Sequence, residues 1–134
     1  MTVETTPVDE VGWQQQWDNA GLFHADIHPD RPKFYCLEMY PYPSGKMHMG
    51  HVRNYSIGDA VARYKRLMGF DVLYPMGFDS FGMPAENAAI SEGGHPHDIT
   101  ERNMASITEQ IKRMGFSYDW RRTVSYTHLT LPTT

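Results

Sequence analysis

The sequence PYPSGKMHMGH, at positions 41–51, places prolines, glycines and histidines between an apolar strand-like run and a helix-like run. Its histidines, His48 and His51, are three residues apart, so at a helix start they point to about the same side. Each imidazole, charged or neutral, can donate a hydrogen bond to a phosphoryl oxygen on which charge builds up. The same pair is also half of a zinc site. The stretch can therefore be a turn, a metal site or a nucleotide-binding loop.

The neighbouring residues favour an anion as the ligand. Pro41 and Pro43 fix φ and lack N–H donors, which keeps the exit of the strand extended. Ser44 and Gly45 expose backbone N–H groups near a helix N-terminus, where these donors and the helix dipole attract an anion. Gly50 has no Cβ, so a flat ligand can approach the backbone there.

No metal site is predicted, because a zinc site needs more ligands than this stretch offers. His95 and His97 lie on a distant loop. Cys36 is the only cysteine, and in a strand-like run it is expected to act as a small buried hydrophobe.

Strands and helices of a parallel sheet must position these residues. Residues 33–40 predict a strand, and the run at 70–78 supplies a second short strand that is ended by Pro75. Residues 52–69 predict a helix between them. Further helices are expected at 9–23, ending near Gly21, at 83–90 and at 98–115, with starts at Pro84 and Asp98. The apolar face expected for the 52–69 helix consists of Ile57, Val61, Tyr64 and Met68.

A strand, a crossover helix and a second strand form a βαβ unit, so the predicted fold class is α/β. In such sheets ligands bind beyond the carboxyl ends of the strands. Residues 41–51 and the loop expected at 77–82 should therefore lie together at one end of the sheet. Asp79 in that second loop is either a turn residue or a carboxylate of the site.

Composition excludes several classes of protein. With 134 residues, 40% hydrophobic and 21% charged, the chain is expected to form one modest folded domain. A net charge of -4 argues against a simple basic surface for nucleic acid. A single cysteine excludes an internal disulfide framework and suits a reducing compartment. The absence of a membrane-length apolar run or a secretion signal predicts a soluble, cytoplasmic protein.

Residues 41–89 resemble the first half of the catalytic domain of the leucyl-tRNA synthetases, which are class I aminoacyl-tRNA synthetases. HMGH at 48–51 matches the H-x-G-H signature of that class, and the words PYPSG, RNYSIGD and GFDSFGMPAENAA resemble the leucine branch. The resemblance covers about residues 10–123. It implies part of a Rossmann-like nucleotide-binding domain, with a parallel sheet and crossover helices but incomplete.

The resemblance also implies a set of site residues. His48 and His51 resemble the pair that contacts the ATP phosphates and stabilises the transition state. Met39, Tyr42 and Asp79 resemble the leucine pocket, with Asp79 binding the α-ammonium group. Gly50 resembles the glycine against which adenine packs. The ATP-binding set expected in this way is Pro41, Tyr42, Pro43, Ser44, Gly45, His48, Met49, Gly50 and His51.

The implied reaction is the ATP-dependent activation of leucine to leucyl-adenylate, followed by transfer to tRNA(Leu). Mg²⁺ is expected to accompany ATP, and no tightly bound cofactor is expected in this segment. Most tRNA contacts are expected outside it, and the sequence assigns no role to Lys46.

The chain departs from the family pattern in two ways. Phe78, Ser80 and Met83 stand where the leucine branch commonly has Trp, Ala and Leu, which keeps the character of each position. An editing domain and the second, lysine-bearing ATP motif are not present, so this chain alone is expected to be inactive.

Residues 1–123 are expected to be the native part of the catalytic domain. Residues 124–134 resemble a translated sequencing adapter and are expected to be a non-native tail.

Two alternatives stay open at this point. The first is another class I synthetase or a nucleotidylyltransferase that uses the same H-x-G-H loop. The second is a non-catalytic module that binds nucleotide or tRNA.

Overall fold

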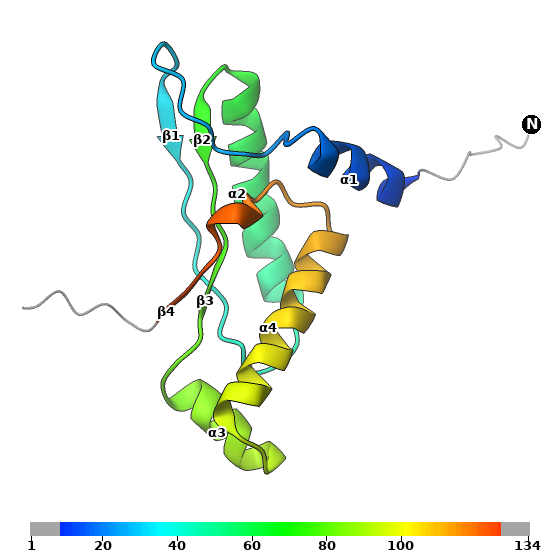
Figure 1. The fold of residues 1–134 in the computed structure, drawn as a ribbon, viewed down its shortest axis with the longest axis vertical. Helices are drawn as coiled ribbons and strands as arrows, with labels where there is room; N and C mark the ends of the chain where they lie inside the picture. The colour runs from blue at the N-terminus through cyan, green and yellow to red at the C-terminus, as the bar shows by residue number, and fades with distance from the viewer. Residues whose placement is uncertain (1–8, 127–134) are drawn as a thin grey trace, which may run out of the picture.

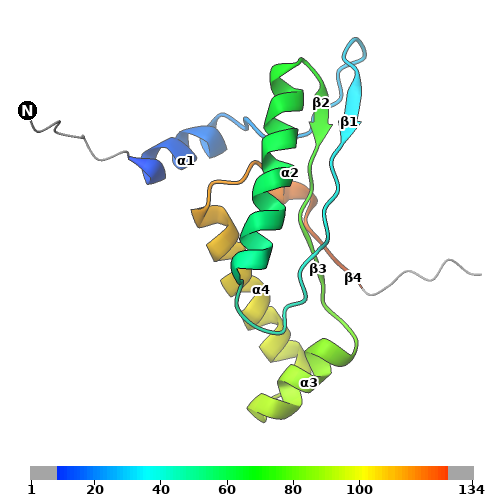
Figure 2. The same cartoon turned by 180° about the vertical axis from the view of Figure 1, so that it is seen from behind.

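The computed structural model describes residues 9–126 of the chain. The helices and strands follow one another as shown in Figures 1 and 2. Their bounds are α1 Glu10–Asn19, β1 Lys33–Tyr35, α2 Met49–Leu67, β2 Asp71–Leu73, β3 Gly77–Asp79, α3 Met83–Glu92, α4 Pro96–Arg113, the 3₁₀ helix η1 Trp120–Arg122 and β4 Val124–Tyr126.

The strands form two parallel pairs, which confirms the predicted α/β class. β1 pairs with β2, with Phe34 opposite Val72, and β3 pairs with β4, with Phe78 opposite Ser125. Helix α2 connects β1 to β2 and so completes the expected βαβ unit. Both views place α2 and α4 on the same side of the strands, while α1 extends away from them.

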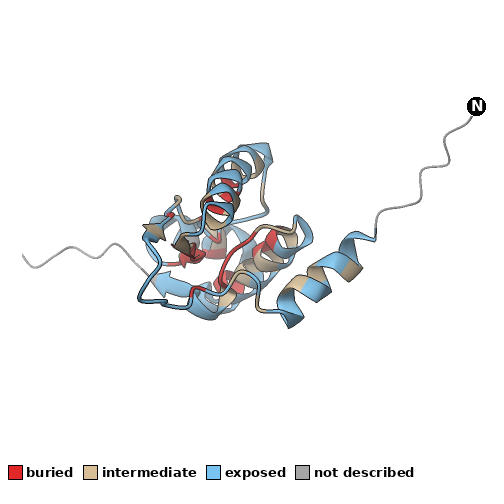
Figure 3. Ribbon diagram, turned by 90° about the horizontal axis from the view of Figure 1, so that it is seen from above, coloured by how far each residue is buried: buried red, intermediate tan, exposed pale blue. Residues whose placement is uncertain are grey.

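The core lies where α2 and α4 meet the strands, and Figure 3 shows the buried segments gathered there. Tyr55 and Ala62 reach it from α2, and Ile107 and Ile111 from α4. The buried residues of this cluster are Cys36, Tyr55, Ala62, Val72, Tyr74, Met76, Phe78, Ile107, Ile111 and Tyr118. Cys36 is therefore buried, as the sequence predicted.

The apolar face predicted for α2 is wrong. The four side chains assigned to it are 40–59% exposed: Ile57, Val61, Tyr64 and Met68. The buried side chains of this helix are instead Tyr55, Asp59 and Ala62.

The buried face of α2 is partly polar because Asp59 has partners inside the protein. Its Oδ1 accepts hydrogen bonds from the Ser117 N–H and Oγ–H, each at 2.6 Å. Its Oδ2 accepts from Arg63 Nε at 2.7 Å. A carboxylate with this many donors can be buried at low cost, so a hydrophobicity pattern alone misplaced the face.

Several element bounds also differ from the predictions. The two predicted strands are each shortened to three residues, and Gly77–Asp79, expected in a loop, form β3. Helix α4 begins at Pro96 rather than Asp98, because His95 is its N-cap and accepts from the His97 N–H at 3.3 Å. Gly21, at φ +59°, follows α1 as expected.

The boundary expected after Thr123 stays a prediction. Val124–Tyr126 form β4 beside β3, and the rest of the expected tail lies outside the described residues. None of the helices between residues 9 and 126 is both long and apolar enough to cross a membrane.

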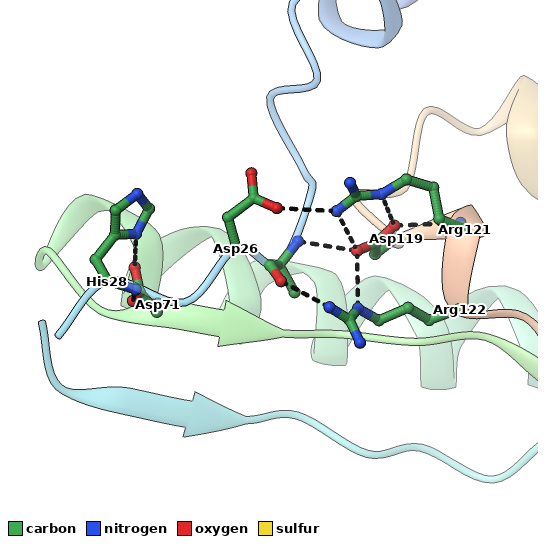
Figure 4. A network of polar contacts seen from close by, with 7 residues as sticks. Asp26, His28, Asp71, Asp119, Arg121 and Arg122 are labelled. Atoms are coloured by element: carbon green, nitrogen blue, oxygen red, sulfur yellow. Dashed lines mark hydrogen bonds and ion pairs between the residues drawn. The ribbon is translucent and has the colours of Figure 1, made fainter.

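A buried carboxylate joins the segment before β1 to η1 (Figure 4). Asp119 accepts from the Ala25 N–H at 2.9 Å and from Arg121 Nε at 3.0 Å, and Arg122 Nε lies 3.4 Å away. Burial by itself would raise the pKa of Asp119. The hydrogen bonds from Arg121 and Ala25 outweigh burial and lower the pKa to about 2.

This carboxylate predicts a specific acid sensitivity. Because the pKa of Asp119 is lower in the folded than in the unfolded chain, its stabilisation is complete above about pH 4 and disappears as pH falls towards 2. Asp119→Asn should therefore lower the free energy of unfolding by about 2 kcal/mol at pH 7 and by much less at pH 2.5. Urea unfolding followed by circular dichroism at both pH values measures this difference.

Asp26→Asn is the matched control. Asp26 is exposed and lies 3.4 Å from the same arginine, Arg121, so its replacement should change the free energy of unfolding little. Equal losses for both variants at pH 7 would contradict the role given to Asp119.

Candidate functional site

The segment that follows β1 leaves the sheet and contacts β3. Cys36 N–H still donates to Leu73 O at 2.9 Å, but residues 37–48 lie outside the helices and strands. Further along, the Asp79 N–H donates to Pro41 O at 3.2 Å. This bond confirms that residues 41–51 lie beside the 77–82 segment, although Asp79 is in a strand rather than a loop.

The loop at residues 41–48, called here the 41–48 loop, packs against the protein through its prolines. Pro41 and Pro43 are fully buried. The stiff, extended exit expected from their fixed φ stays a prediction. Tyr42, Ser44 and Gly45 are exposed. The loop therefore presents these three residues to solvent, whereas Met47 is half-buried against the core.

Two amide side chains of α4 hydrogen-bond to the backbone of the 41–48 loop. Asn103 Nδ2 donates to Pro43 O at 3.0 Å, and the Met47 N–H donates to Gln110 Oε1 at 3.2 Å. Sequence reasoning missed both residues. Their seven-residue spacing puts them on one side of α4, but that spacing alone does not indicate a partner sixty residues away.

Tyr55 connects the 41–48 loop to the residues before it. Its side chain is fully buried, and its hydroxyl donates to Met39 O at 3.2 Å. Its ring stacks on His51, with centroids 5.8 Å apart and planes 10° apart. One side chain thus contacts a predicted leucine-pocket residue and a predicted ATP-binding residue.

Glu38 is fixed by two buried tyrosines. Its Oε2 accepts from Tyr74 Oη at 2.6 Å and from Tyr118 Oη at 2.5 Å. Burial raises the pKa of Glu38 above its ordinary value, although the tyrosine bonds act in the opposite direction. The carboxylate fits because Gly58 faces it: a Cβ there would lie 1.7 Å from Glu38 Oε1. These bonds fix the backbone next to Met39.

The two histidines cap the N-terminus of α2. His48 is the N-cap residue, and its Nδ1 accepts from the Gly50 N–H at 3.1 Å. In return, His51 Nδ1 accepts from the His48 N–H at 3.3 Å. The two rings stack with centroids 4.0 Å apart. Gly50 leaves room for this arrangement, since a Cβ there would lie 2.9 Å from His48 Cε1.

The caps decide which ring nitrogen carries the proton. Because Nδ1 of each ring accepts a backbone hydrogen bond, the neutral ring carries its proton on Nε2. Burial, and then the nearby His48, lower the pKa of His51. The lowered pKa favours the neutral form of His51, whose proton is then on Nε2.

The family of the chain follows from the match of its sequence to a known family model. Residues 35–133 match the family model described as tRNA synthetases class I (M). The chain belongs to the class I tRNA synthetases.

Similar proteins within this family are leucine–tRNA ligases. The chain is 61% identical over 113 residues to a leucine–tRNA ligase of Nitratidesulfovibrio vulgaris strain Miyazaki F, which covers 84% of the chain and 14% of the ligase. It is 60% identical over 116 residues to the leucine–tRNA ligase of Paramagnetospirillum magneticum, covering 87% of the chain and 14% of the ligase. The chain thus spans a small part of the length of these relatives.

Solved synthetase structures resemble the fold. The Agrobacterium radiobacter K84 agnB2 LeuRS–tRNA–LeuAMS complex matches with a TM-score of 0.85 and 46% identity, over 88% of this chain and 15% of that one. The Mycobacterium tuberculosis methionyl-tRNA synthetase in complex with methionyl-adenylate matches with a TM-score of 0.63 and 30% identity, over 66% and 17%. These matches support the Rossmann-like assignment of an incomplete catalytic domain.

The structure brings most of the predicted site residues to one region. The 41–48 loop, the start of α2 and Asp79 are joined by the bonds described above. Met39 and Tyr42 are 66% and 49% exposed, and their roles stay predictions. Across residues 9–126, no three side chains among His, Cys, Asp and Glu gather as a metal site requires.

The caps predict a difference between two substitutions of His48. Asparagine is a good N-cap residue, so the free energy of unfolding of His48→Asn should lie within about 0.5 kcal/mol of that of the unmodified chain. His48→Ala removes the side-chain acceptor and should lower the free energy of unfolding by about 1 kcal/mol. Urea unfolding followed by circular dichroism distinguishes the two, and equal stability losses would show that His48 does not cap α2.

Proposed function

We propose that this segment is part of a leucine–tRNA ligase and that its 41–51 region binds ATP for the activation of leucine. The observation that carries the proposal is the paired histidine cap, because it turns two Nε2–H donors into fixed features of a helix N-terminus. Such a terminus favours an anion through its backbone donors and its dipole. The high identity to leucine–tRNA ligases supports leucine as the amino acid.

In the proposed reaction a leucine carboxylate oxygen attacks the α-phosphorus of ATP and forms leucyl-adenylate. The bond from the α-phosphorus to the bridging oxygen breaks, and pyrophosphate leaves with its electron pair. His48 and His51 donate hydrogen bonds to phosphoryl oxygens, whose negative charge changes during the attack. Chemistry of this type depends on positioning and charge stabilisation rather than on a covalent nucleophile.

Leucine is proposed to bind between the end of β1 and β3. Met39 and Tyr42 offer exposed apolar and aromatic surface, and the half-buried Asp79 offers a carboxylate for the α-ammonium group. The Asp79–Pro41 backbone bond fixes the distance between that acid and the 41–48 loop. In the next step the whole enzyme would transfer leucine to tRNA(Leu), largely through parts outside this segment.

Mg²⁺ is proposed to enter with ATP as the counter-ion of the phosphates. The cytoplasm, where tRNA, leucine and ATP are all present, is the proposed location.

A second candidate substrate is methionine, because a methionyl-tRNA synthetase shares the fold with a TM-score of 0.63. Leucine is preferred, since the LeuRS structure matches better at 0.85 and with higher identity.

The test uses a full-length chimera, in which residues 9–123 of this chain replace the aligned segment of the Nitratidesulfovibrio vulgaris leucine–tRNA ligase. ATP–pyrophosphate exchange is measured with leucine, methionine, valine and isoleucine. Leucine-dependent exchange is expected. Exchange with methionine in place of leucine would contradict the proposal.

In the same chimera, His51→Ala should slow leucine-dependent exchange by about 100-fold, because it removes a donor that stabilises developing charge. Leucine affinity, measured by calorimetry, should change little. An unchanged exchange rate would contradict the role given to His51.

A further inference from the structure

The backbone of the 41–48 loop depends on α4 for part of its hydrogen bonding. The loop lies outside the helices and strands, so its backbone groups have no ladder partners. Asn103 donates to the Pro43 carbonyl at one end of the loop, and Gln110 accepts from the Met47 N–H at the other. The two bonds thus flank the exposed residues between them.

Helix α4 is well suited to fix the ends of this loop. Asn103 and Gln110 are seven residues apart, which separates them by two turns, or about 10.5 Å, along one side of the helix. Ile107 and Ile111 are buried in the core and hold the helix itself in place. The loop is therefore tied to a rigid part of the protein.

The orientation of the Gln110 amide is also determined. Its Nε2 donates to Ser106 Oγ at 3.2 Å, one turn back along α4. That bond directs the donor end of the amide to Ser106 and leaves Oε1 as the acceptor for the Met47 N–H. The side chain is half-buried, which further limits its rotation.

We propose that Asn103 and Gln110 are positioning residues for ATP binding. They act through the loop: by fixing Pro43 and Met47, they hold the backbone donors of Ser44 and Gly45 and the approach to His48 in a binding conformation. This inference rests on the proposed function of the same loop.

The two amides should affect ATP more than leucine. Their bonds reach the loop at residues 43 and 47, on the side of His48. Of the residues proposed for leucine, Met39 and Asp79 are fixed separately, by the Tyr55–Met39 and Asp79–Pro41 bonds, and Tyr42 directly follows Pro41. Loss of the bonds between the loop and α4 therefore leaves the Tyr55–Met39 and Asp79–Pro41 bonds in place.

The test uses the full-length chimera described above and measures dissociation constants for ATP and for leucine by calorimetry. Gln110→Met and Asn103→Leu keep the size of each side chain and remove its hydrogen bond to the loop. Each should weaken ATP binding by about fivefold, as expected for the loss of one hydrogen bond, with leucine binding within about twofold of the unmodified value. Ser106→Ala removes only the partner that orients Gln110 and should weaken ATP binding by less.

Glu109→Met is the matched control, because Glu109 is an exposed residue on the same helix. It should leave both dissociation constants unchanged. Two variants at separate positions are used. If the thermal melt of one shows that it folds poorly, the other still tests the inference.

Unchanged ATP binding in both loop variants, or equal weakening for ATP and leucine, would overturn the inference. The proposed function is judged separately by leucine-dependent exchange in the unmodified chimera. If that exchange is absent while the variants still weaken ATP binding selectively, the positioning role stands and the assignment to leucine fails.

Discussion

The structure depends on how one non-regular segment satisfies its backbone polar groups. After β1, residues 37–48 run without helix or strand. A buried backbone N–H or C=O without a partner costs free energy comparable to a lost hydrogen bond. Here the partners come from elsewhere in the fold: Tyr55 for Met39, Asp79 for Pro41, and two side chains of α4 for Pro43 and Met47. The segment therefore takes its shape from tertiary contacts.

The same constraint explains why chemistry is placed at the end of this segment. The chain enters α2 through His48, and the two histidines satisfy backbone N–H groups at the helix start with their Nδ1 atoms. Capping and the proposed chemistry thus use opposite nitrogens of the same rings. The stacked Tyr55 ring connects this cap to the segment before it. Stability of the helix start and the geometry of the site are consequently linked.

Local features of the sequence predicted much of this arrangement. The βαβ unit followed from a strand-like run, a helix-like run and a second strand, and the meeting of residues 41–51 with Asp79 followed from the geometry of parallel sheets. Pro41 and Pro43 predicted a stiff exit because proline restricts its own backbone wherever it stands.

Features that depend on distant partners were not predictable in this way. The buried face of α2 is set by Asp59, whose donor Ser117 is 58 residues away, so the apolar pattern indicated the wrong side. Asn103 and Gln110 have no local signature that marks them as loop partners. Gly77–Asp79 resembled a loop, yet they form a strand because β4 lies beside them.

The most direct test of this account is the hydrogen exchange rate of the Met47 amide, measured by NMR on the 134-residue chain. Met47 lies outside the helices and strands of residues 9–126, and its N–H donates to Gln110 Oε1. We expect exchange at least about tenfold slower than in an unstructured peptide of the same sequence. Exchange at the unstructured rate, while the amides of α2 and α4 stay protected, would contradict it.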